Sequence, residues 1–168
     1  MHEQATVYII LEDIRSIHNV GAIFRTADAA GVTQIFLCGV TPGPIDRFGR
    51  VVSALQKTAL GAETTVSYRK EESAVSTVQE LRSAGVQVWA VEQTATAANM
   101  MCAVFQRTQA TAFVFGNEVA GVSEAVLQEV DGVFYLPMWG SKESLNVSVA
   151  TGITLYLYRT LLQQASVE

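Results

Sequence analysis

Short apolar runs alternate along the chain with longer stretches of helical character. The runs are rich in β-branched and aromatic residues and occupy residues 7–11, 33–39, 64–68, 86–92, 111–116 and 132–137. Helical stretches lie between them at residues 23–30, 71–84 and 123–130. Each of these is closed by a glycine suited to end a helix, namely Gly31, Gly85 and Gly132. This alternation predicts an α/β fold with a mostly parallel sheet flanked by helices.

The last predicted helix covers about residues 145–164 and carries apolar side chains around most of its circumference. A helix that only covers its own sheet needs a single apolar stripe, so the excess favours a subunit interface. Burial within one subunit is an equal alternative. The longest irregular stretch is predicted at residues 39–50, where three glycines and two prolines interrupt regular structure.

Length and composition fit one globular domain over residues 1–168. Of the 168 residues, 49% are apolar, which is enough to bury the core of five or six elements. No run reaches the roughly 18 apolar residues of a membrane span. The N-terminal sequence also lacks the features of a signal peptide. We therefore expect a cytoplasmic protein with no membrane contact.

The charges and the numbers of cysteines and histidines limit which ligands the protein is expected to bind. The net charge of −5 argues against holding nucleic acid by bulk electrostatics. However, residues 1–70 carry seven Lys/Arg against six acids, whereas residues 71–168 carry four against ten. If nucleic acid binds, the N-terminal half should face it, although an ordinary solvated surface explains the same charges. With only two distant cysteines and two histidines, we expect neither a disulfide framework nor a metal site.

The first segment of chemical interest is NVGAIFRTADAAGV, at residues 19–32, which follows the first strand and opens a helix. Asn19 is suited to cap that helix. Arg25 lies six residues later among small and apolar residues. It can pair with Asp28 or Asp13, or it can hold a phosphate through its planar fork of donors.

The second segment is FVFGNEVAGVSE, at residues 113–124, where a strand runs into a glycine-flanked turn. Its glycines have the spacing of a phosphate-binding P-loop, but Val122 stands where the lysine is needed, which argues against nucleotide triphosphate hydrolysis. No GxGxxG follows a strand, so the dinucleotide fingerprint is missing as well. What remains is a turn that presents Asn117 and Glu118 at the carboxyl end of a strand, where open parallel sheets bind ligands.

The third segment is LPMWGSKESLNVSVATG, at residues 136–152, again a strand end followed by a loop and a helix. Ser144, Asn146 and Ser148 gather polar groups at the predicted helix start. Free backbone N–H groups at such a start can bind an oxygen-bearing ligand. Helix capping accounts for one of the three side chains and hardly for all of them.

In their order and context, the three segments resemble the TrmH (SpoU) family of the SPOUT superfamily, which methylates ribose 2'-hydroxyls of RNA. The resemblance runs from about residue 7 to 162 and includes KTALGAE (57–63) and VEQTA (91–95). It implies a trefoil knot within roughly residues 112–160. It also implies a homodimer formed through the C-terminal helix and the knot region. The additional RNA-binding domain of some family members is not expected here.

The same resemblance implies S-adenosylmethionine as the methyl donor, bent among the loops that follow three of the strands. The residues implied to contact it or lie beside it are Val91, Glu92, Gln93, Gly116, Asn117, Leu136, Met138 and Leu145.

Catalytic roles follow from the resemblance together with a chemical need. A ribose hydroxyl must lose its proton as it attacks a methyl group, and a guanidinium is a poor base. By resemblance, Arg25 binds an RNA phosphate whose oxygen takes that proton. Asn19 positions Arg25 or the ribose, and the remaining residues, Glu118, Ser144 and Asn146, orient the reacting groups. His18 is an alternative base.

The nature of the RNA is set by family analogy alone. The small size favours tRNA over rRNA as the substrate. Methylation of a base nitrogen is one alternative activity. A module on the same fold that binds RNA without catalysis is another.

Overall fold

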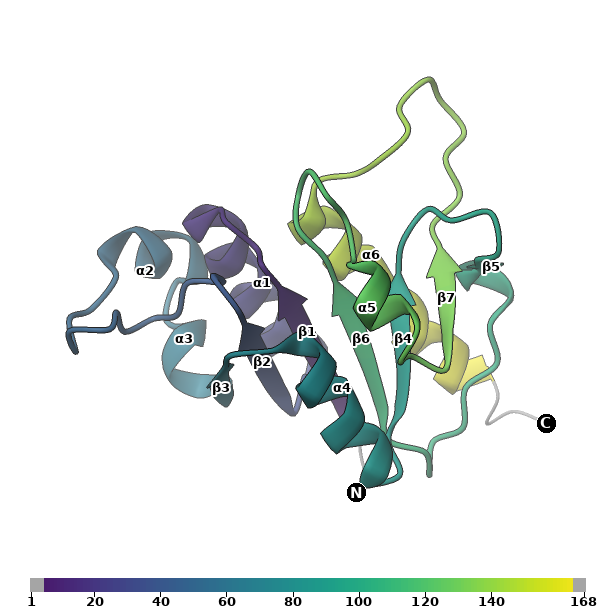
Figure 1. Cartoon of the computed structure of the whole chain (residues 1–168), viewed down its shortest axis with the longest axis horizontal. Helices are drawn as coiled ribbons and strands as arrows, with labels where there is room; N and C mark the ends of the chain where they lie inside the picture. Colours follow the sequence, from purple (N-terminus) through teal and green to yellow (C-terminus); the bar gives the residue numbers. More distant parts are fainter. Residues whose placement is uncertain (1–4, 165–168) are drawn as a thin grey trace.

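The computed structural model describes residues 5–164, and within them the named strands form one sheet (Figure 1). The strands are β1 (Val7–Glu12), β2 (Gln34–Cys38), β3 (Tyr68–Glu71), β4 (Gln87–Val91), β5 (Ala98–Asn99), β6 (Thr111–Phe115) and β7 (Gly132–Tyr135). Their order across the sheet is β3-β2-β1-β6-β4-β7-β5, and every neighbouring pair runs parallel. The predicted parallel sheet is therefore confirmed.

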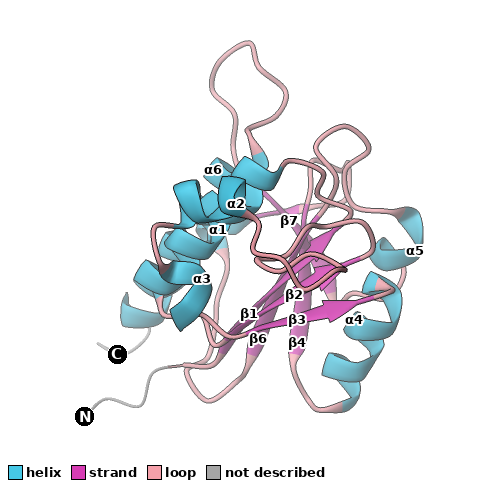
Figure 2. Cartoon of the chain, turned by 90° about the vertical axis from the view of Figure 1, so that its left-hand side faces the viewer, coloured by secondary structure: helices cyan, strands magenta, loops and turns pink. Residues whose placement is uncertain are grey.

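Helices cover both faces of this sheet. They are α1 (Ile17–Ala30), α2 (Ser53–Ala59), α3 (Ala62–Thr65), α4 (Ala74–Ser83), α5 (Glu124–Leu127) and α6 (Val147–Gln164), with a 3-10 turn, η1, at Met100–Cys102. Figure 2 shows α1, α2, α3 and α6 on one face and α4 and α5 on the other. In the described part of the chain, no helix is both long and apolar enough to cross a membrane.

The central strands could be predicted from the sequence because both of their faces are buried. In β1, Ile9 and Leu11 pack into the core beneath α1 and α6, and Ile10 packs into the core beneath α4. In β6, Phe113 and Val114 divide between the two cores in the same way. Strands of a parallel sheet covered on both faces read as continuous apolar runs, which is the pattern found.

Two predicted boundaries are wrong. Residues 64–68 were expected to form a strand, but α3 occupies their first half and β3 begins only at Tyr68. The Thr64 hydroxyl donates to the backbone carbonyl of Gly61 at 2.7 Å, and such a local bond competes with strand pairing.

Gly132 ends no helix, because α5 stops at Leu127 and Gly132 is the first residue of β7. A glycine is needed there for packing. A Cβ on Gly132 would lie 2.5 Å from the Trp89 ring.

The C-terminal helix agrees with its prediction in extent and in its excess of apolar residues. Its buried positions include Leu155 and Tyr158, whereas Val149, Ile153 and Tyr156 form an exposed apolar stripe. The segment between β7 and α6 projects beyond the rest of the molecule in Figure 1. The trefoil knot expected in this region stays a prediction.

The close approach of α1 and α2 depends on Gly21. A Cβ at this position would lie 2.0 Å from the Thr58 hydroxyl oxygen and 2.5 Å from the Leu55 carbonyl oxygen. We expect Gly21→Ala to lower the free energy of unfolding by about 1–3 kcal/mol, because the two helices must move apart. Urea denaturation followed by circular dichroism measures the change.

The matched control is Gly152→Ala in α6, where the nearest atom, the Thr26 methyl carbon, lies 3.5 Å from the new Cβ. Alanine there should be neutral or should stabilise the helix by up to about 1 kcal/mol. Equal stability of the two variants would contradict the close packing described at Gly21.

Candidate active site

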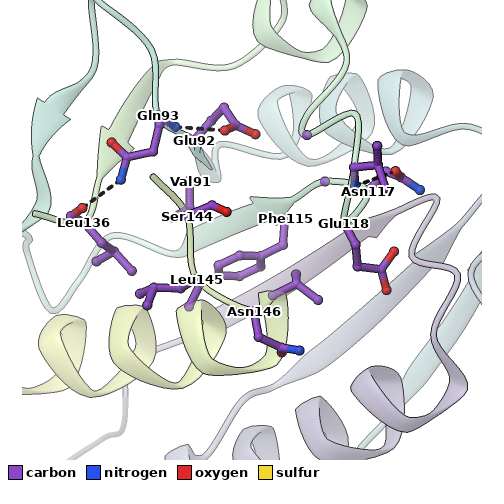
Figure 3. Close-up of a pocket in the computed structure, with 15 residues that line it drawn as sticks. Val91, Glu92, Gln93, Phe115, Asn117, Glu118, Leu136, Ser144, Leu145 and Asn146 are labelled. Atoms are coloured by element: carbon purple, nitrogen blue, oxygen red, sulfur yellow. Dashed lines mark hydrogen bonds between the residues drawn. The ribbon is translucent and has the colours of Figure 1, made fainter. Parts of the chain in front are cut away.

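The loops that leave the carboxyl ends of β4, β6 and β7 meet around a cavity of about 260 Å³ (Figure 3). The start of α6 forms another wall of this cavity. The lining residues are Val91, Glu92, Gln93, Phe115, Gly116, Asn117, Glu118, Val119, Gly121, Leu136, Ser144, Leu145, Asn146, Val147 and Ala150. The cavity thus lies at the sheet edge where parallel sheets bind ligands.

The turn after β6 has a shape that only glycines permit. A Cβ on Gly116 would lie 2.2 Å from the backbone of Gly121, and Gly121 has φ +73. Asn117 stabilises the turn, since its side-chain oxygen accepts the N–H groups of Val119 and Ala120 at 2.9 and 3.0 Å. This tight turn directs Glu118 toward the beginning of α1.

Glu118 accepts three hydrogen bonds from the N-terminal end of α1. The backbone N–H groups of Arg15 and Ser16 donate to it at 3.1 and 3.0 Å, and the Asn19 amide donates at 3.1 Å. Partial burial works to raise the pKa of Glu118, but these three donors and its own N–H outweigh that effect and hold the pKa below its ordinary value of 4.5. At neutral pH Glu118 is therefore a carboxylate and a weak proton acceptor.

Asn146 connects the start of α6 to the same group. Its amide nitrogen donates to the Asn19 side-chain oxygen at 3.1 Å. Its own oxygen accepts the backbone N–H and the hydroxyl of Ser148 at 2.8 and 2.6 Å, as a helix cap does. A continuous hydrogen-bonded series, Glu118–Asn19–Asn146, thus borders the cavity.

Glu92 and Gln93 hold the other side of the cavity together. The Glu92 carboxylate accepts the backbone N–H of Val122 at 2.9 Å, which joins the loop after β4 to the turn after β6. The Gln93 amide donates to the Leu136 carbonyl at 2.8 Å, which joins the same loop to the end of β7. Figure 3 shows both residues across the cavity from Glu118 and Asn146.

Most of the residues singled out in the sequence lie together. Those that line the cavity are Val91, Glu92, Gln93, Gly116, Asn117, Glu118, Leu136, Ser144, Leu145 and Asn146. Asn19 joins them through its hydrogen bonds. Met138 is not among the lining residues, and neither is His18, which is exposed.

Sequence reasoning missed Phe115, Val119, Gly121, Val147 and Ala150, which also line the cavity. Helical spacing could have found Ala150, because it lies one turn after Asn146. Phe115 precedes Gly116 at the strand end, and its apolar character suits equally a wall of the cavity or the core.

The expected capping role of Asn19 is wrong. Ser16 is the N-cap of α1, and its hydroxyl accepts the backbone N–H of Asn19 at 3.2 Å. Asn19 therefore lies within the first turn of the helix. Because its side chain is not used for capping, the amide is available to bridge Glu118 and Asn146.

Arg25 belongs to α1, which covers the same face of the sheet as α6 (Figure 2), but it does not line the cavity. It is six residues beyond Asn19, which places it about 9 Å farther along the helix and on a different side of it. There it is exposed and lines a second hollow between α1, α2 and α6, the Arg25 hollow, together with Ala22, Thr26, Ala29, Lys57, Thr58 and Tyr156. The described residues show no ion pair between Arg25 and Asp28 or Asp13.

The sequence model of the SpoU rRNA Methylase family matches residues 6–156. The chain belongs to this family. The 23S rRNA (guanosine-2'-O-)-methyltransferase RlmB of Bordetella pertussis is 36% identical to this SpoU-family chain over 154 residues. That alignment covers 92% of this chain and 59% of the relative, so the chain spans about three fifths of the length of such curated relatives.

Solved structures of the SpoU type share the fold. The AdoMet-bound rRNA methyltransferase of Sinorhizobium meliloti superposes with a TM-score of 0.84 at 28% identity, over 95% of this chain and 58% of that one. The TrmH/SpoU tRNA modifying enzyme of A. aeolicus gives a TM-score of 0.82, also at 28% identity, over 98% of this chain and 79% of that one. The predicted SpoU-type architecture is confirmed.

The hydrogen bonds to Glu118 predict a pH-dependent contribution to stability. A carboxyl group with a lowered pKa stabilises the folded state above its ordinary pKa of 4.5, and this contribution is lost as the pH falls below that value. We expect Glu118→Gln to lower the free energy of unfolding by about 1 kcal/mol at pH 7, a value that allows for its solvent exposure. The difference from the wild type should shrink as the pH falls below 4.5 and be smaller at about pH 3.

Urea unfolding at the two pH values measures this difference. The control is Glu124→Gln in α5, an exposed carboxylate whose side chain accepts one bond, from Gln128, within residues 5–164. It should change stability little at either pH. A Glu118→Gln difference that stays constant with pH would show that the charge at this position is not involved.

Proposed function

We propose that this chain is an S-adenosylmethionine-dependent methyltransferase that modifies a ribose 2'-hydroxyl of RNA. The observation that carries the proposal is the meeting of three strand-end loops around a cavity bordered by Glu118, Asn19 and Asn146. Membership of the SpoU family supports it, as do the names of the relatives.

The residues that line the cavity suit S-adenosylmethionine, the proposed methyl donor. Phe115, Leu136 and Val147 offer apolar contact for an adenine ring, and the turn at Gly116 lets the backbone approach a ligand closely because no side chain intervenes. Gln93 and Ser144 add polar groups for the ribose and the amino-acid portion. When bound, S-adenosylmethionine supplies an electrophilic methyl group. Of the cofactor residues expected from the sequence, Met138 has the weakest support.

The proton of the attacking hydroxyl needs an acceptor. Glu118 is poorly suited, because its hydrogen bonds hold its pKa low and occupy its oxygens. We assign this role to an RNA phosphate oxygen held by Arg25, with Asn19, Ser144 and Asn146 orienting the ribose. Arg25 lies outside the cavity of its own chain, so the assignment requires a second chain or the RNA itself to bring the two sites together.

A homodimer formed through α6 satisfies this requirement. Val149, Ile153 and Tyr156 leave 48%, 39% and 56% of their surface exposed and form one stripe along the helix. Apolar stripes of this kind commonly mark subunit interfaces. Tyr156 also lines the Arg25 hollow, so a copy packed on the stripe lies beside Arg25.

Ribosomal RNA is the better candidate substrate, which reverses the preference drawn from chain length. The curated relatives that match over 92% of this chain act, by name, on 23S rRNA. Among the structural neighbours, the rRNA methyltransferase and the tRNA modifying enzyme are equally similar at 28% identity, so the names of the curated relatives carry this preference. Alkaline hydrolysis of the product distinguishes ribose from base methylation, because a 2'-O-methyl group blocks cleavage at its own phosphodiester.

Two variants should separate cofactor binding from methyl transfer. Ala150→Phe places a ring in the cavity and should weaken S-adenosylmethionine binding at least tenfold, by about 1.4 kcal/mol or more, in calorimetry. Arg25→Ala should leave that affinity within a few-fold but lower transfer to 23S rRNA by a factor of about 100 or more. Ala125→Phe, on the exposed side of α5, is the control for the added ring. Persistent transfer by Arg25→Ala would overturn the role given to this arginine.

Ile153→Arg should disrupt the dimer, because it puts a charge into the centre of the α6 stripe. We expect monomers in sedimentation and loss of methyl transfer, with the helical content unchanged. Ala125→Arg is the control, since Ala125 is exposed on α5, which covers the opposite face of the sheet from α6 (Figure 2). A dimer that survives Ile153→Arg would place the interface elsewhere.

A further inference from the structure

The loop between β2 and α2 ends in a small structure of its own, the 45–51 tip. An antiparallel bridge joins Ile45 to Val51. Between them the Asp46 carboxylate accepts the backbone N–H groups of Phe48 and Arg50 at 2.8 and 2.9 Å, and the Arg50 guanidinium at 2.8 Å. These donors lower the pKa of Asp46. The tip is therefore held in one shape by its own hydrogen bonds.

This shape presents an aromatic ring to solvent. Phe48 leaves 66% of its surface exposed, although an apolar side chain of this size is normally buried. Two positively charged side chains lie over the ring. The guanidinium carbons of Arg47 and Arg50 are 4.8 and 4.9 Å from the ring centroid. Stacking of guanidinium groups on a ring accounts for the geometry but not for leaving the ring outside the core.

The two arginines differ in how firmly they are held. Arg50 forms an ion pair with Asp46 at 2.8 Å. No ion pair of the described residues includes Arg47, which is exposed. Arg47 can therefore leave the ring at little cost.

The tip is also basic in an acidic protein. Residues 39–60 contain three basic residues, Arg47, Arg50 and Lys57, and one acid, Asp46, whereas the whole chain has a net charge of −5. Lys57 lies in the Arg25 hollow, so the basic groups continue from the tip toward that hollow along α2. A polyanion is the partner that this charge arrangement selects.

We propose that the 45–51 tip is a binding site for single-stranded RNA, in which an unpaired base stacks on Phe48. The base takes the place of the Arg47 guanidinium over the ring, and Arg47 turns to a neighbouring phosphate. Arg50 stays on Asp46 and supports the ring. Exposed aromatic rings beside basic groups are the usual platform for unpaired bases. This site rests on the proposed function, because it binds the substrate of the same enzyme.

The test measures binding of a labelled oligoadenylate of about twelve nucleotides by fluorescence anisotropy, without cofactor. Phe48→Ala should weaken binding about tenfold, and Phe48→Trp should restore it, because base stacking is worth roughly 1–3 kcal/mol. Arg47→Ala should lower the slope of log affinity against log salt by about 0.7, as expected for one lost phosphate contact on a single strand. Val40→Ala is the matched control, since Val40 is in the same loop and is 67% exposed.

Undiminished RNA binding by Phe48→Ala would overturn this site. If that variant also dissociated in sedimentation, the tip would be a protein interface instead. The proposed function fails separately, through absence of S-adenosylmethionine binding or of methyl transfer by the wild-type chain. Weaker oligoadenylate binding by Phe48→Ala would support the RNA site even then.

Discussion

The arrangement of the site depends on the hydrogen bonds that the Glu118 carboxylate accepts. The carboxylate joins a turn after β6 to the N-terminal end of α1, more than a hundred residues earlier in the chain. Through Asn19 and Asn146 the same connection reaches the start of α6. The donors at the start of a helix need acceptors, and a carboxylate supplies them with a favourable charge for the helix dipole. Thus one side chain binds the segment that leads into α1 and fixes the relative positions of three segments around the cavity.

Parallel pairing makes this connection possible, and it is also what the sequence predicted best. Leu11 of β1 is in register with Phe115 of β6, so the segments that follow both strands leave the sheet at the same edge. Burial on both faces gave these strands continuous apolar runs, from which their positions could be predicted. Once the strands are known, the residues immediately after them, such as Gly116 and Asn117, are expected at a ligand site on general grounds.

The details that could not be predicted depend on contacts between distant residues. Ser16 and Asn19 both have side chains suited to an N-cap. In the structure Ser16 caps α1, and the Asn19 amide instead donates to Glu118, a residue far away in the sequence. Gly132 follows a helical pattern and therefore resembles a helix end in the sequence. Its actual role depends on the Trp89 ring packed against it, and the local sequence does not show this tertiary contact. Local patterns contain no information on any of these contacts.

Arg25 lies outside the cavity of its own chain. The cavity is built from residues 91–150, whereas Arg25 and the basic residues of α2 and the 45–51 tip belong to the N-terminal half. The proposed cofactor site and the cationic surface lie on different parts of one chain, so they act together only if the substrate extends across both or a second copy brings them into contact. A long polyanion does the first, and the exposed stripe of Val149, Ile153 and Tyr156 favours the second. Under the proposed function the two solutions are compatible, because an RNA that spans the proposed dimer can contact the tip of one subunit while its reacting ribose lies in the cavity of the other.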